Sequence, residues 1–145
     1  MESHIFIIEN INGFECVKSF VSESQWYDLL DDVSDKTLDV LSCYLQMPDG
    51  RAGVVEIEQK FGIKWQSVNI LITMLGKKAH DEICPNIEIQ YPGGKWGGNK
   101  RWPFAMNKGR MENHLFVYEL RPELYDAAKR YLKDVNWTYV EPIKI

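Results

Sequence analysis

The sequence has few cysteines, no long apolar run and no low-complexity segment. Its three cysteines, Cys16, Cys43 and Cys84, are odd in number and widely spaced, which argues against a disulfide framework and against a zinc site. No apolar run approaches the roughly 18 residues that a membrane-spanning helix needs. The first residues carry no basic segment of the kind that begins a signal peptide. We therefore expect a cytoplasmic protein with no membrane contact, no metal and no cofactor.

The chain does contain enough apolar side chains for one core. With 145 residues, of which 45% are hydrophobic and 26% charged, it has the composition of a single globular domain spanning residues 1–145. The net charge of −4 is unevenly distributed. Residues 1–63 carry 12 acidic and 4 basic side chains, whereas residues 64–110 carry 3 acidic and 8 basic ones. Because phosphate binding depends on the local field, the middle of the chain is a candidate nucleic-acid surface. The acidic first half is a candidate surface for a protein partner.

Residues 91–110, YPGGKWGGNKRWPFAMNKGR, concentrate this positive charge. They contain five basic residues, five glycines and two tryptophans, and no acidic residue. Strand-like runs at residues 87–91 and 114–120 flank the segment, which predicts an elaborated β-hairpin. Its glycines would let phosphates or bases approach the backbone. Trp96, between two glycine pairs, is predicted to be exposed and able to stack on a base. The alternative is a surface hairpin whose lysines are only solvated.

The N-terminal part, residues 1–33, is predicted to form a small hairpin and a helix. Asn12-Gly13 is a strong hairpin-turn dipeptide between the apolar runs 4–8 and 14–17. Ser22 and Gln25 have the spacing of a capping box, which predicts a helix over residues 23–30.

Residues 34–86 are predicted to form a helix-turn-helix. Helices are expected at residues 35–47 and 64–82, while residues 54–61 fit either a helix or a strand by their periodicity. Gly62 would end a helix there as a left-handed cap. The polar side of the 64–82 helix shows side chains at steps of three and four residues, namely Gln66, Asn69, Thr73 and Lys77.

Residues 87–145 complete the predicted fold with a wing, a last helix and a closing strand. Pro122 is suited to the first turn of that helix, and residues 135–140 read as the strand. The expected class is therefore α+β, with a winged helix-turn-helix core preceded by an N-terminal β-hairpin and helix.

In a winged helix the second helix of the pair enters the major groove of duplex DNA, and the wing lies along phosphates. Gln66 and Asn69 are residue types that read adenine edges, and basic side chains suit phosphates. The predicted DNA-binding residues are Gln66, Asn69, Thr73, Lys77, Lys95, Trp96, Lys100, Arg101, Lys108 and Arg110. Two alternatives remain open: a polar helix face that is only solvated, and a module that binds protein instead of DNA.

An enzymatic alternative comes from Asp49, Glu58 and Lys60, which match the P-D…E-x-K pattern of many restriction nucleases. In those enzymes two carboxylates hold Mg²⁺ and the lysine helps to activate water. The pattern requires Glu58 and Lys60 to lie on a strand beside Asp49. Because residues 54–61 read better as a helix, we do not expect an enzyme.

Several short motifs carry a family resemblance. They are LGKKAH at residues 75–80, CP at 84–85, KRWPF at 100–104, GR at 109–110 and FVYELRPEL at 116–124. Together with the helix-turn-helix they resemble a winged-helix-like module found beside 5-methylcytosine-specific (McrB-like) restriction AAA+ ATPases and related restriction proteins. The resemblance covers about residues 25–132 and implies binding to duplex DNA, modified or unmodified, in restriction or defence. The chain has no Walker motif, so no ATPase activity is implied, and residues 93–99 are longer than the matching part of the pattern.

Overall fold

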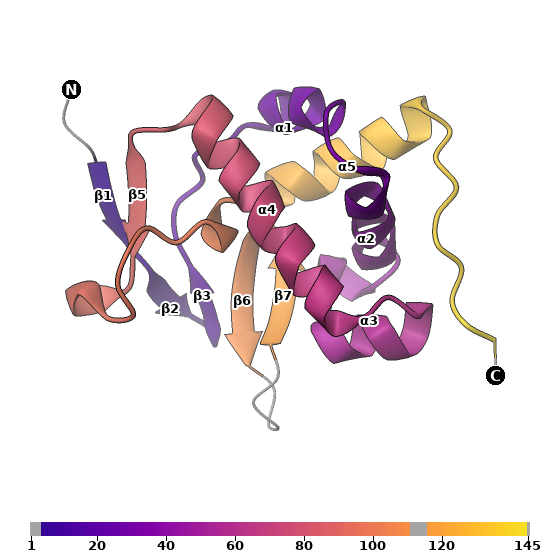
Figure 1. Cartoon of the computed structure of the whole chain (residues 1–145), viewed down its shortest axis with the longest axis horizontal. Helices are drawn as coiled ribbons and strands as arrows, with labels where there is room; N and C mark the ends of the chain where they lie inside the picture. Colours follow the sequence, from indigo (N-terminus) through magenta and orange to yellow (C-terminus); the bar gives the residue numbers. More distant parts are fainter. Residues whose placement is uncertain (1–3, 111–115, 145) are drawn as a thin grey trace.

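The computed structural model describes residues 4–110 and 116–144, and it confirms the α+β class (Figure 1). A five-stranded antiparallel sheet has the order β2-β3-β6-β7-β4, and a separate two-stranded sheet pairs β1 with β5 in parallel. The strands are β1 (His4–Ile7), β2 (Glu9–Ile11), β3 (Phe14–Cys16), β4 (Arg51–Gly53), β5 (Ile87–Gln90), β6 (Met106–Arg110) and β7 (Phe116–Leu120).

The α-helices pack on one another and on the larger sheet. They are α1 (Glu23–Leu30), α2 (Asp35–Leu45), α3 (Val54–Phe61), α4 (Trp65–Ile83) and α5 (Pro122–Asp134). Helix α4 is the longest of these and contacts α1, α2 and α3. Side chains from several helices meet in one core, where Trp26, Tyr44, Ile57 and Leu124 are completely buried.

The turn of the N-terminal hairpin and the first helix form where the sequence predicts them, but the first strand of the hairpin is residues 9–11 and not the predicted run 4–8. Asn12 and Gly13 have φ angles of 53° and 85°, the left-handed pair that a two-residue hairpin turn requires. The capping box of α1 is complete, since the Gln25 amide donates to Ser22 Oγ at 3.2 Å and the Ser22 amide donates to Gln25 Oε1 at 2.9 Å. The hairpin joins β2 to β3, whereas residues 4–7 pair with β5 in the other sheet.

Residues 54–61 form a helix. Val54, Ile57 and Phe61 lie on one side of α3 and are buried, so helical spacing places all three in the core. Gly62 ends the helix with φ of 82°, the left-handed cap expected from its position. The order of elements from residue 35 is therefore α2, β4, α3, α4.

Two sequence predictions about strands are wrong. Residues 91–110 are not a hairpin, because β5 pairs with β1, in whose sheet the apolar side chain of Ile89 is fully buried. The hairpin is formed by β6 and β7, and the residues joining them, 111–115, lie outside the described residues. Residues 135–140 run alongside helices without a strand partner in the described chain. There the Val140 amide donates to Ser42 Oγ and its carbonyl accepts from Gln46 Nε2.

Candidate nucleic-acid interface

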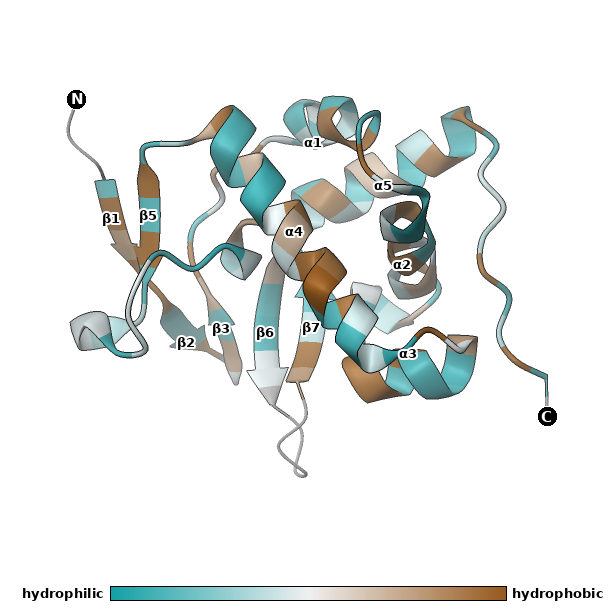
Figure 2. Ribbon diagram, viewed as in Figure 1, coloured by the Kyte–Doolittle hydropathy of each residue, from teal (hydrophilic) through white to brown (hydrophobic). Residues whose placement is uncertain are grey.

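Helix α4 presents one side to the core and the other to solvent. Val68, Ile72, Leu75 and Ala79 recur at helical spacing and are buried. The opposite side carries exposed residues of mixed character, and Figure 2 shows that the middle of the helix is hydrophobic. These outer-face residues are Gln66, Ile70, Thr73, Met74 and Lys77.

Ile70 and Met74 are the functional candidates that the sequence analysis did not identify. Each is 58% exposed, on the same face as Gln66 and Lys77. Large apolar side chains on an outer helix face commonly mark a contact surface when they lie together. The signal was available in the sequence, because both residues fall outside the buried stripe that contains Val68 and Ile72.

Asn69 lies at the edge of the outer face and is half-buried. Its Oδ1 accepts a hydrogen bond of 2.6 Å from the hydroxyl of Tyr118 on β7. Burial raises the pKa of Tyr118 to about 12, so this hydroxyl remains a donor at neutral pH. Bidentate reading of adenine needs both the oxygen and the nitrogen of an asparagine amide. The Asn69 oxygen is already used to join α4 to the sheet.

Thr73 and Lys77 are exposed but have partners within the helix. The Thr73 hydroxyl donates to the Asn69 carbonyl at 3.0 Å, and Lys77 Nζ lies 2.6 Å from Asp81 Oδ2. Hydrogen bonds from Lys77, and secondly from His80, lower the pKa of Asp81 to about 2. Exposed ion pairs of this kind contribute little free energy, so a phosphate could compete with Asp81 for Lys77.

The loop after β5 presents Trp96 and Lys95 to solvent. Trp96 is 69% exposed and has φ of 66°, and Lys95 Nζ lies 5.0 Å from the centroid of its ring. The base of the loop is fixed, because the Asn99 side chain bonds the Ile89 amide and the Ile87 carbonyl of β5. Lys100 Nζ donates to the Trp96 carbonyl at 2.9 Å. The loop therefore presents an aromatic ring and two cations on a stable base.

The side chain of Lys108 is mostly buried. Its Nζ is 4.5 Å from the ring centroid of Trp102, 4.6 Å from that of Phe116 and 3.9 Å from Glu15 Oε1. Only 12% of the side chain is exposed, so Lys108 is held in an aromatic and acidic environment. The sequence shows that Lys108 is basic, but only the fold shows that its ammonium group is enclosed.

The two predicted arginines are placed differently. Arg101 Nη1 donates to the Asn99 carbonyl at 3.2 Å, and the Arg101 backbone packs against Gly76 of α4. A Cβ at Gly76 would lie 2.0 Å from the Arg101 carbonyl oxygen, so only glycine allows the loop to approach the helix this closely. Arg110 ends β6, and its side chain lies outside the described part of the chain.

The residues of the nuclease pattern do not form a site. Glu58 and Lys60 lie on α3, and the Trp65 amide at the start of α4 donates to Glu58 Oε1 at 2.8 Å. The strand that this alternative requires is therefore a helix. Within residues 4–110 and 116–144 no three His, Cys, Asp or Glu side chains are grouped so that they could hold a metal ion.

His80, near the C-terminal end of α4, contacts two polar side chains of the protein. His80 is buried, with Nδ1 2.7 Å from Asp81 Oδ1 and Nε2 3.3 Å from Asn99 Nδ2. Cys84 lies four residues further along, but burial raises the pKa of its thiol to about 11. The contact between His80 and Asn99 joins α4 to the loop after β5.

Comparison of the chain with protein-family models, with curated proteins and with solved structures finds no match. Among the described helices, none has both the length and the apolar composition needed to cross a bilayer. The function is therefore inferred from the geometry of the outer face of α4 and of the loop that follows β5.

Proposed function

We propose that the chain is a winged-helix module that binds duplex DNA through the outer face of α4. The observation that supports this most is the succession α2, β4, α3, α4, β6, β7, interrupted between α4 and β6 by β5, which joins the other sheet; β6, β7 and β4 are adjacent and antiparallel. This is the order of helix, strand, helix, recognition helix and wing hairpin. One face of α4 is exposed, and Asn69 at the edge of that face is bonded to Tyr118 of β7.

The proposed contact residues differ from those expected from the sequence. Gln66, Thr73 and Lys77 remain, and Ile70 and Met74 join them because apolar side chains contact thymine methyl groups in the major groove. Lys95, Trp96 and Lys100 form a second contact region for phosphates or an unpaired base. Asn69 and Lys108 are assigned to the framework, since their polar groups already have partners inside the protein.

A second candidate function is protein binding through the same helix face. The specific observation in its favour is the exposure of Ile70 and Met74, since apolar side chains are enriched at the centres of protein interfaces. The resemblance to restriction-associated modules favours DNA, so duplexes with and without 5-methylcytosine belong in the same test.

The test is fluorescence anisotropy of labelled duplexes over a series of salt concentrations. The double substitution Lys95→Ala with Lys100→Ala should flatten the log–log salt slope by about 0.9 for each phosphate that the variant no longer binds. The matched control is Lys129→Ala with Lys133→Ala, which removes the same charge from exposed positions of α5. Gln66→Ala should weaken binding to a preferred duplex by about 1–3 kcal/mol if the side chain reads a base edge.

Equal slopes for wild type, test pair and control pair would remove the loop after β5 from the interface. No salt-dependent binding by the wild-type protein would overturn the DNA proposal. Protein docking on Ile70 and Met74 would then be the function consistent with the exposed face.

A further inference from the structure

Strand β1 has one edge that no described strand covers. The amides of His4 and Ile8 donate to the carbonyls of Asn86 and Gln90 beside β5, at 3.0 and 2.9 Å. Because the backbone groups of successive strand residues point to opposite edges, the amides and carbonyls of Ile5 and Ile7 face away from β5. Among the described residues, β5 is the only strand that pairs with β1.

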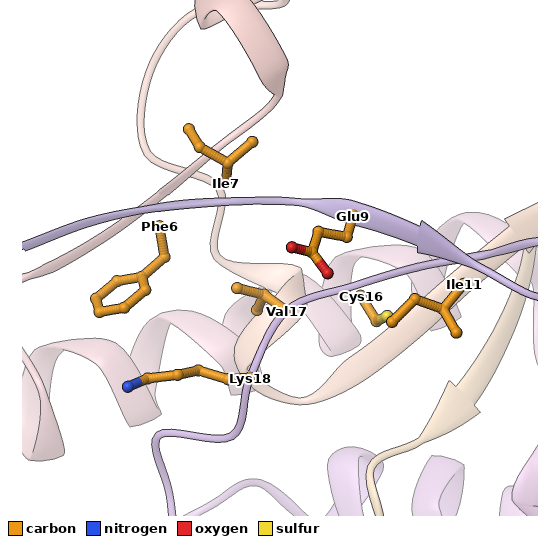
Figure 3. A pocket seen from close by; sticks show the side chains of 7 residues that line it. All are labelled: Phe6, Ile7, Glu9, Ile11, Cys16, Val17 and Lys18. Atoms are coloured by element: carbon orange, nitrogen blue, oxygen red, sulfur yellow. The ribbon is translucent and has the colours of Figure 1, made fainter.

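This open edge faces a groove of about 420 Å³ (Figure 3). On one side lie Phe6, Ile7, Glu9 and Ile11, and on the other lie Cys16, Val17 and Lys18. The groove exists because β3 pairs with β2 as far as Cys16, after which the chain diverges from β1.

The divergence is held by a buried side chain. Arg121 Nη2 donates to the Val17 carbonyl at 2.7 Å, while its Nη1 donates to the Pro103 carbonyl. The Val17 carbonyl is thereby engaged with Arg121. Phe6 and Phe20 meet edge to face at 4.7 Å and join the two walls. The groove is therefore fixed by contacts within the folded protein.

The groove combines strand-edge groups with apolar side chains, a carboxylate between Ile7 and Ile11, and an ammonium group at one end. Ile7 and Ile11, which line the groove, are 44% and 52% exposed, and Ile5 on β1 is 56% exposed. Figure 3 shows the Glu9 carboxylate directed into the groove, and the Lys18 ammonium at the end nearest Phe6. Such a site is suited to β-strand addition, in which main-chain hydrogen bonds provide affinity and alternate side chains provide specificity.

We propose that this groove binds an extended segment of a partner protein as an added strand on β1. The segment has apolar side chains at alternate positions, a basic side chain opposite Glu9 and an acidic one opposite Lys18. This function is independent of DNA binding by α4.

A second copy of this chain is a poorer occupant for two reasons. Its own β1 is covered by β5 on one edge and faces residues 16–18 across the groove on the other, so it is not free to enter the groove of another copy. In addition, residues 1–63 carry 12 acidic and 4 basic side chains, so two such surfaces repel each other. The same charge attracts a segment with a basic side chain.

The test uses the full chain, labelled with ¹⁵N, and two blocked peptides with alternating valines and opposite charge order. They are Ac-Arg-Val-Thr-Val-Glu-NH₂ and Ac-Glu-Val-Thr-Val-Arg-NH₂. One of them, at millimolar concentration, should shift the amide signals of residues 4–11 and 16–18. Methylation of its edge-facing backbone amides should weaken that peptide about tenfold or more, because the strand-pairing hydrogen bonds can no longer form.

Ile7→Pro removes one edge amide without touching the bonds to β5, and it should also weaken the peptide about tenfold. Glu9→Lys should weaken whichever peptide binds the wild-type protein, and replacing the arginine of that peptide by glutamate should restore binding. Absence of shifts with both peptides would overturn the proposal. So would equal affinity of the methylated peptide, or shifts at these residues that depend on protein concentration alone, the sign of a second copy in the groove.

Discussion

The hydrogen bond between Asn69 and Tyr118 connects α4 to the central strand of the β6-β7-β4 unit. Tyr118 is buried, so its hydroxyl depends on Asn69 as its acceptor. We expect Asn69→Ala to lower the free energy of unfolding by about 1–3 kcal/mol, the cost of leaving a buried donor unpaired. Tyr118→Phe removes the donor itself and leaves the half-buried Asn69 to be hydrated, so its cost should be smaller, about 0.5–1.5 kcal/mol.

Urea unfolding of both variants measures this difference. If Asn69→Ala unfolds at the wild-type urea concentration, the residue has no structural role and returns to the set of candidate DNA contacts.

At the scale of elements, the C-terminal segment after α5 fastens α2 and α3 without forming a strand. Trp137 Nε1 donates to Asp39 Oδ1 at 3.1 Å, and the Ile143 amide donates to the Lys60 carbonyl at 2.7 Å. Trp137→Ala should lower the free energy of unfolding by about 1–2 kcal/mol, below the range for a fully buried tryptophan. The exposed neighbour Thr138→Ala is the control and should change it by less than about 0.5 kcal/mol. Thermal unfolding of the two variants tests this. Equal melting temperatures for Trp137→Ala and Thr138→Ala would mean that the segment is only loosely attached.

Caps and turns that depend on neighbouring residues could be predicted from the sequence, whereas the pairing of distant strands could not. The capping box at Ser22, the turn at Asn12-Gly13 and the cap at Gly62 each depend on neighbouring residues, so each could be predicted. The partner of β5 could not, because an apolar run of four residues does not specify which strand it will join.

The candidate site follows the same division. Helical periodicity placed Gln66, Thr73 and Lys77 on the exposed side of α4, where they lie. It could not show that Asn69 would bond a tyrosine from β7, or that Lys108 would be enclosed by Trp102 and Phe116. These contacts join residues far apart in the chain, and residue type alone gives no information about them.

On the scale of the whole molecule, we expect one cooperative unfolding transition. Trp26 of α1 and Trp102, which follows the loop after β5, are both buried in the same core. Tryptophan fluorescence and far-UV circular dichroism should therefore give coincident urea curves, with an m-value of about 1–3 kcal/mol/M. Separate midpoints would show that the chain does not unfold in one cooperative transition.

The contact between Glu58 and the Trp65 amide has a consequence for how α4 could approach DNA. The first amides of a helix carry partial positive charge and commonly serve as an anion site for a phosphate group. In this protein a carboxylate from the preceding helix already occupies one of these amides. A phosphate arriving end-on would meet a negative charge. For the DNA binding proposed above, this predicts that α4 lies lengthwise against the double helix, with Gln66, Ile70 and Thr73 facing it, and does not enter the groove tip first.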